Sequence, residues 1–379
     1  MRSSFRRFLL PAAALALVTG VAVVASRADD KTPAPTQASA AKTFATPEEA
    51  AKALFQAMEA NDDAALRSLV GPGSEDLAQD GKDPVVQKER TEMAAAAKTK
   101  LAIEKQADGS AILVIGSMEY PLAVPLVQGN GAWRFDAEAG RKELLARRIG
   151  EQEMEAIGIC LAYVDAQVVY AQKDRNGDGV REFAQKILST PGQKDGLYWD
   201  SADGEEASPA GPELTPFKEA LASGSAKKAP FNGYYWRILS AQGPHAAGGA
   251  FSYVINGRML AGFALLAAPA VYRNTGVMSF LVSNQGKVYE KDLGPDTLTV
   301  AGAIDAFDPD GTWREVDEKT LQAAEGTLPA DAPFAEGGAQ QVGATSSKGP
   351  AGSMGTAAQA TPGLTPATSP AAGAPCPRK

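Results

Sequence analysis

The sequence of 379 residues contains only one histidine and two cysteines. With His245 alone, the chain cannot build a metal centre from several histidines, and Cys160 and Cys376 fit a zinc site neither in number nor in spacing. We expect Cys160 to lie in a helix and Cys376 in a low-complexity tail. The sequence therefore predicts no framework disulfide.

Basic residues are outnumbered, because 37 Lys and Arg face 45 Asp and Glu and the formal net charge is -8. An acidic chain is repelled by nucleic acid phosphates and by anionic membrane surfaces. We therefore expect no nucleic acid partner. The same charge favours solubility and can attract cations.

A long apolar run occurs near the N-terminus, from Phe8 to Ala25, after the positive residues Arg2, Arg6 and Arg7. Small residues follow this run, as at a cleavage site. This order is typical of a signal peptide, which we assign to residues 1–28. The protein is then exported, periplasmic or secreted, without a membrane span in the mature chain. The alternative is a retained anchor, since the run approaches the ~20 residues that cross a bilayer.

Residues 29–42 are rich in Ala, Pro and Thr and are expected to form a flexible linker, followed by an N-terminal α+β domain at 43–137. A capping box at 46–49 and the Asn-Asp-Asp at 61–63 predict the starts of two helices. Apolar runs then predict antiparallel strands at 101–104, 111–115, 120–127 and 132–135. This element order resembles the cone-shaped nuclear-transport-factor-like fold.

A second α+β domain is predicted at 138–317, with a long helix over 138–173 and a four-stranded antiparallel sheet. The tight turn Asn284-Gln285-Gly286 joins the last two strands. The predicted strands of this sheet are 234–241, 260–267, 277–283 and 287–293. A long helix followed by such a sheet is similar to the head of a type IV pilin or pseudopilin. Residues 334–379 have few large apolar side chains and are predicted to be disordered.

The clearest local motif is a candidate calcium loop that starts at Asp174. Oxygen ligands at alternate positions can converge on one hard cation, with a glycine at 179 making the turn. The candidate metal ligands are Asp174, Asn176, Asp178, the carbonyl of Val180, and Glu182. Gln185 stands where a calcium loop has a bidentate glutamate, which lowers the expected affinity. The alternative is a polar Asx-rich turn between two helical segments.

Two further groups of residues could carry chemistry. A cluster of aromatic residues could line a groove or fill the core, and we favour the core; it comprises Tyr198, Trp199, Tyr234, Tyr235 and Trp236. Nearby carboxylates could serve glycoside cleavage or lie on the solvated surface, namely Asp200, Asp203, Glu205 and Glu206. His245 lies in a glycine-rich stretch without a nucleophile motif, and we expect an exposed loop histidine.

Three stretches together carry a family resemblance: WRFDAEAGRKELLARRIGEQE from Trp133, DRNGDGVREFAQKILSTPGQKDGLYW from Asp174, and the segment from Gly233 to Thr297. They resemble the bacterial exported family catalogued as domain of unknown function 2950, over roughly Phe44 to Asp317. The resemblance implies export and a shared fold, and it implies no reaction.

The sequence thus favours an exported non-enzymatic envelope protein that acts in binding or assembly. Its partner would be another envelope protein or a surface ligand, and Ca²⁺ would be structural. The alternative is a periplasmic hydrolase that acts on glycan or peptide through the acidic and aromatic residues from Tyr198 to Glu206.

Overall fold

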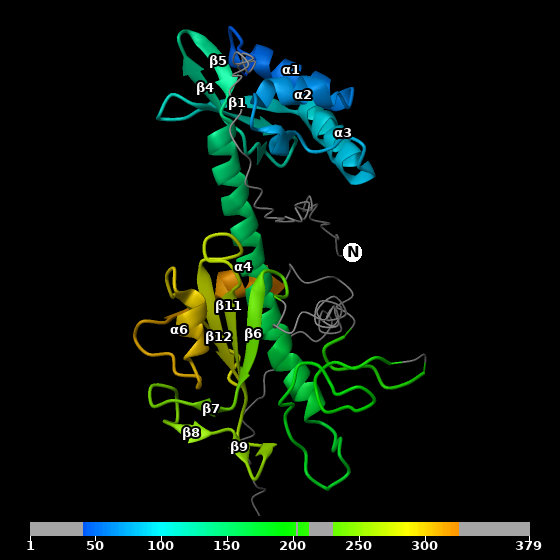
Figure 1. The fold of residues 1–379 in the computed structure, drawn as a ribbon, viewed down its shortest axis with the longest axis vertical. Coiled ribbons are helices and arrows are strands. Elements are labelled where there is room, and N and C mark those ends of the chain that lie inside the picture. The colour runs from blue at the N-terminus through cyan, green and yellow to red at the C-terminus, as the bar shows by residue number, and fades with distance from the viewer. Residues whose placement is uncertain (1–40, 202–203, 212–229, 326–379) are drawn as a thin grey trace, which may run out of the picture. The chain divides into compact units, whose positions relative to one another are not determined.

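A computed structural model describes residues 41–201, 204–211 and 230–325 of the chain (Figure 1). These residues form helices and antiparallel sheets, so the predicted α+β class is confirmed. The predicted signal peptide, nearly all of the linker, the tail at 334–379 and Cys376 lie outside the described residues. None of the helices in the described ranges is long and apolar enough to cross a bilayer.

Helices α1 (Pro47–Glu59) and α2 (Asp63–Val70) begin where the sequence predicts. The Thr46 hydroxyl accepts a hydrogen bond from the backbone N–H of Glu49 at 3.2 Å, and Asp62 accepts one from Ala65 at 3.0 Å. Each bond satisfies one of the free N–H groups at a helix start. Both predicted helix starts are therefore confirmed.

A 3-10 turn, η1 (Glu75–Ala78), and a third helix, α3 (Pro84–Thr99), were not predicted. Asp83 caps α3 by accepting from the N–H of Val85 at 2.8 Å, and Pro84 occupies the first turn. The buried face of α3 consists of Val86, Arg90 and Ala94. Because Arg90 is charged and Ala94 is small, the sequence of α3 lacks the regular spacing of large apolar residues that predicts a helix.

The first sheet is antiparallel, with strand order β1-β2-β4-β5 and β3 paired to β2. Its strands are β1 (Leu101–Lys105), β2 (Ala111–Ile115), β3 (Tyr120–Pro121), β4 (Leu126–Gly129) and β5 (Ala132–Phe135). The run at 120–127, predicted as one strand, is two strands. Pro121 and Pro125 lack the N–H that a continuous ladder requires.

Helices α1, α2 and α3 lie beside this sheet (Figure 1). Their facing side chains form the first hydrophobic core, which includes Ala50, Leu66, Leu69, Leu113, Leu126, Trp133 and Phe135.

Helix α4 (Ala137–Tyr170) corresponds to the predicted long helix and is capped by Asp136. Its buried residues fall into two groups, Ala137 and Gly140 at the start, and the residues from Ala156 to Tyr170. The second group belongs to a second hydrophobic core.

The second sheet has the order β14-β13-β12-β11-β6, so all four predicted strands are present with one more at the edge. Its strands are β6 (Tyr234–Leu239), β11 (Ala264–Pro269), β12 (Met278–Ser283), β13 (Val288–Asp292) and β14 (Arg314–Glu315). The turn between β12 and β13 is confirmed, because Gly286 has φ +74 and donates to the Ser283 carbonyl at 2.9 Å. Helix α4 packs against β11, β12 and β13.

Several shorter elements follow α4 in this part of the chain. They are β7 (Ala241–Gln242), β8 (Phe251–Ser252), β9 (Val254–Ile255), β10 (Arg258–Met259), α6 (Thr297–Gly302) and α7 (Glu318–Glu325). Helix α7 lies beyond the predicted domain end at residue 317, yet it packs on α4 and buries Ala324 completely. Both cores belong to one compact unit, and the two-domain, pilin-like arrangement stays a prediction.

Candidate functional site

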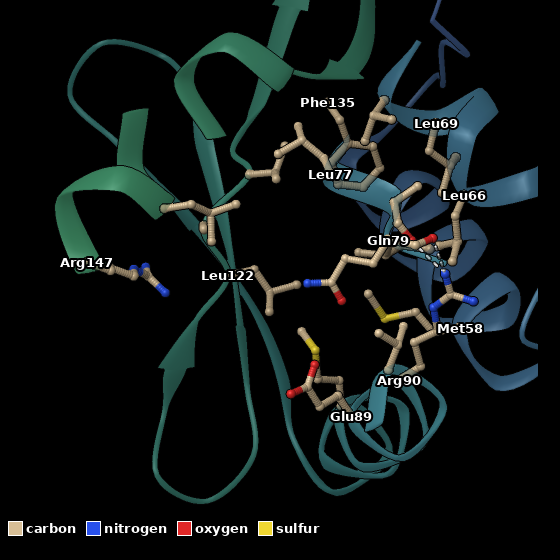
Figure 2. Close-up of a pocket in the computed structure, with 18 of the residues that line it drawn as sticks. Met58, Leu66, Leu69, Leu77, Gln79, Glu89, Arg90, Leu122, Phe135 and Arg147 are labelled. Carbon is tan, nitrogen blue, oxygen red and sulfur yellow. Dashed lines mark hydrogen bonds between the residues drawn. The ribbon is translucent and has the colours of Figure 1, made fainter. Parts of the chain in front are cut away.

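A cavity of about 280 Å³ lies between helices α1–α3, the first sheet and the first turns of α4. Its wall is mainly apolar (Figure 2). The apolar lining consists of Leu54, Met58, Leu66, Leu69, Val70, Leu77, Val86, Met93, Leu122, Val124, Phe135 and Leu144. The volume is nearly twice the ~150 Å³ that accommodates benzene in an engineered cavity. A space of this size and polarity can hold a small molecule with a large apolar part.

Two carboxyl residues, Glu89 and Glu151, are among the residues that line this space. Glu89 lies on α3 and lines the cavity, and its Oε1 atom is buried without a hydrogen-bond partner. Burial raises the pKa of Glu89 above its usual range, and the nearby carboxylates of Asp83 and Glu92 raise it further. An unpartnered buried oxygen is uncommon in a folded protein and requires an explanation.

A second polar side chain, Gln79, projects into the same space (Figure 2). Gln79 follows η1 directly and has φ +47, which is uncommon for a residue with a side chain. The backbone carbonyl of Gln79 is held by Arg90 at 3.2 Å. The turn after η1 is therefore fixed in the conformation that presents the amide to the cavity.

Arg90 is almost fully buried, and its guanidinium group is already occupied by protein groups. It donates to the Asp63 carboxylate at 2.7 Å, to the Ala78 carbonyl at 2.6 Å and to the amide oxygen of Asn61. The hydrogen bond from Arg90 is the main reason why the pKa of Asp63 is lowered. Arg90 therefore holds α2, η1 and α3 together and is not available as a cationic partner for Glu89.

Arg147 on α4 closes one side of the cavity next to Tyr120. It donates to the Tyr120 hydroxyl at 3.1 Å, to the Pro121 carbonyl at 2.9 Å and to the Glu143 carboxylate at 2.8 Å. These contacts tie the helix to β3. The charge of Arg147 is balanced by Glu143 on the same helix.

The five candidate calcium ligands lie in one loop after α4. Both Asp174 carboxylate oxygens accept loop N–H groups, from Gly177 at 2.8 Å and from Gly179 at 2.7 Å. The Asp178 carboxylate pairs with Arg258 at 2.6 Å, and Val180 donates its N–H to Asp178. The Asn176 amide donates to Glu182 at 3.2 Å.

Most of these hydrogen bonds join residues of the loop to one another, as in an Asx-rich turn. Within the described ranges, no group of three or more His, Cys, Asp or Glu side chains is placed to hold a metal. The structure therefore leaves calcium binding at this loop as a prediction.

Three of the five aromatic residues, Trp199, Tyr234 and Trp236, belong to the second core. Tyr198, Trp199, Tyr234 and Trp236 are each less than 9% exposed, and Tyr235 is half-buried. Tyr234 and Trp236 point to the same face of β6, as strand alternation predicts. The core interpretation is confirmed for Trp199, Tyr234 and Trp236.

Glu206 lies at the centre of a cationic cluster. It accepts from Lys173 at 2.7 Å, Arg175 at 2.9 Å and Lys194 at 3.4 Å. The hydrogen bonds from Lys173 and Arg175 lower the pKa of Glu206 to about 2. A carboxyl group this acidic holds no proton at neutral pH and cannot act as a general acid. Of the other carboxylates in this group, Asp203 lies outside the described residues.

His245 is an exposed loop histidine, as predicted, with 58% of its side chain accessible. Its Nδ1 atom lies 2.9 Å from the Asp308 carboxylate, and its backbone N–H donates to the same group at 2.7 Å. The hydrogen bond with Asp308 raises the pKa of His245.

The sequence interpretation missed the cavity and Glu89. The lining residues come from segments between Leu54 and Glu151, and their convergence depends on α3, which was also missed. The Asp83-Pro84 pair was the local signal that could have located α3.

Comparison with known proteins finds no match among curated proteins and none among solved structures. A family model described as protein of unknown function (DUF2950) matches residues 41–316, which is more than half of the chain. The family resemblance expected from the sequence is thereby confirmed, and the chain belongs to the DUF2950 family of proteins of unknown function.

Proposed function

We propose that this protein is an exported, non-enzymatic envelope protein whose N-terminal part binds a small, largely apolar ligand. The observation that carries the proposal is the cavity of about 280 Å³ beside the first sheet. Protein interiors are normally close-packed, so a space of this size between large side chains favours a binding role.

Dye binding tests the cavity. We expect the full mature chain to bind the smaller dye 1-naphthylamine, which is neutral at pH 7, saturably and with a change in its fluorescence. Leu122→Trp fills the cavity and should abolish the signal, since Leu122 lies in its wall (Figure 2). Leu101→Trp, on β1 with Leu101 already 42% exposed, is the control and should bind normally. Absence of saturable binding to the unmodified chain would refute the proposal.

The proposed location is supported by the basic, apolar and small-residue order of residues 1–28. Cell fractionation followed by N-terminal sequencing tests it. We expect a mature chain that starts near residue 29 outside the cytoplasm. Recovery of the intact full-length chain from the soluble cytoplasm would contradict export.

The hydrolase alternative has weaker support. It requires a carboxyl group that can deliver a proton, and Glu206 is committed to three cationic side chains. For this reason we favour a binding role over catalysis.

A structural Ca²⁺ ion at Asp174, Asn176, Asp178, Val180 and Glu182 remains part of the proposal. Binding would require Asp178 to exchange Arg258 for the ion, which is consistent with weak affinity. Calorimetry on metal-stripped protein tests it, and Asp174→Asn is expected to reduce the heat of binding. A titration to millimolar calcium without heat would eliminate the site.

A further inference from the structure

We propose that the ligand of this cavity is a small amphiphilic amine, whose ammonium group donates to Glu89 Oε1 and whose alkyl or aromatic part packs on the apolar wall. This inference rests on the proposed binding function. It adds the chemical class of the ligand and assigns Glu89 as the residue that selects it.

The first argument is the unpartnered oxygen of Glu89. Its Oε1 atom is buried and has no donor from the protein. A carboxylate oxygen removed from water without a donor is unfavourable, and a ligand that supplies the donor removes this penalty on binding. An ammonium group supplies both a donor and a compensating positive charge.

The second argument is that the cationic side chains around the cavity have other partners. Arg90 is bound to Asp63 at 2.7 Å, and Arg147 is bound to Glu143 at 2.8 Å. Arg148 donates to the carbonyl and side-chain oxygens of Asn274. In the described part of the chain, none of these three arginines donates a hydrogen bond to Glu89 Oε1, so a bound ligand can supply the compensating charge.

The third argument is the sign of the local field. The charged neighbours that act on Glu89 are Asp83 and Glu92 on the same helix segment, and both are negative. A carboxylate ligand would be repelled by this group of three acids, whereas an alcohol could satisfy the hydrogen bond but not the charge. Among ligands of equal length, the negative charges around Glu89 therefore favour the cation over the alcohol and the carboxylate.

The fourth argument is size. The cavity has a volume of about 280 Å³, whereas a cavity of ~150 Å³ accommodates benzene. By this comparison the cavity can hold on the order of ten non-hydrogen atoms. Leu66, Leu122 and Phe135 line the same cavity and offer carbon atoms to a ligand. A single head group with one short apolar chain or ring matches this combination.

Displacement of bound 1-naphthylamine by n-octylamine, 1-octanol and octanoate tests the inference. The three probes have the same chain length and are positive, neutral and negative at pH 7. With the unmodified chain we expect octylamine to bind at least about tenfold more tightly than octanol, as a charged hydrogen bond implies. Octanoate should bind most weakly.

Two matched variants identify the residue responsible. Glu89→Gln should bring octylamine to the affinity of octanol and leave octanol within about twofold of the unmodified chain. Glu92→Gln removes the same charge from the exposed side of α3 and should keep most of the preference for the amine. Circular dichroism of both variants reports whether they fold.

The outcomes separate the two proposals. Equal affinity of the three probes, tighter binding of octanoate, or an unchanged amine preference in folded Glu89→Gln would overturn the amine inference while leaving a ligand cavity. If the unmodified chain does not bind the dye or any probe, the proposed function fails together with the inference. The comparison of probes on the unmodified chain needs no variant, so misfolding of Glu89→Gln does not prevent a decision.

Discussion

Gln167 provides a quantitative test of how the second core is held together. It is completely buried on α4, and its amide makes three hydrogen bonds. The Nε2 atom donates to the Ala184 carbonyl at 2.8 Å and to the Tyr163 hydroxyl at 3.0 Å, while Oε1 accepts from the Ala184 N–H at 2.8 Å. Gln167 thus pairs with both backbone groups of a buried residue that belongs to no helix or strand.

Gln167→Leu keeps the approximate volume and removes these bonds. The Ala184 N–H and carbonyl then lose their partners, and each unsatisfied buried group costs about 1–3 kcal/mol. Burial of the leucine side chain offsets about 1–2 kcal/mol of this loss, because folding no longer removes a polar amide group from water. We expect the free energy of unfolding to fall by about 1–4 kcal/mol.

Urea unfolding followed by tryptophan fluorescence measures this change. With m-values of about 1–3 kcal/mol per M, the midpoint should fall by on the order of 1 M. Gln172→Leu, at an exposed position shortly after the helix, is the control and should change the midpoint little. A Gln167→Leu midpoint equal to that of the unmodified chain would refute the role assigned to these hydrogen bonds.

Three other predictions concern individual contacts. Because the pKa of Glu206 is lowered to about 2, its ion pairs stabilise the fold above the pKa of the unfolded state, and this stabilisation is lost as the pH falls towards 2. The thermal midpoint of Glu206→Gln should therefore decline less steeply than that of the unmodified chain between about pH 5 and 2. Equal slopes for the two proteins would contradict the ion pairs of Glu206. Thr46→Ala should lower the free energy of unfolding by about 0.5–2 kcal/mol through loss of the α1 cap, and Thr46→Ser should restore most of it in denaturant unfolding. Asp308→Asn should lower the pKa of His245 in an NMR titration, since the hydrogen bond with Asp308 raises it, and an unchanged titration would show that the contact is not formed in solution.

The sequence predicts those parts of the fold that depend on contacts between near neighbours. The starts of α1 and α2 follow from Thr46 and Asp62, which bond to N–H groups three residues ahead. The β12–β13 turn follows from a glycine that adopts a positive φ. In each case the residue that determines the structure lies within the element or directly before it.

The candidate ligand cavity depends on contacts between distant segments, and the sequence gives no direct indication of it. Arg90 can be buried because Asp63 and Ala78 supply its acceptors, and these residues precede it by 27 and 12 positions. From the sequence alone these partners are not known, and a charged residue within a helix then predicts a solvent-exposed position. The unpartnered oxygen of Glu89 is likewise defined only by what surrounds it in space.

Helix α4 has a practical consequence for dissecting this protein into fragments. Its early residues Ala137 and Gly140 are buried, and so is one face of the segment from Ala156 onwards, while the positions between Gly140 and Ala156 are all at least partly accessible. No stretch of coil separates the elements of one core from those of the other at this point. An expression fragment that stops before Gly140 or starts after Ala156 would deprive one core of its own side chains, so a truncation inside α4 must fall between these two residues.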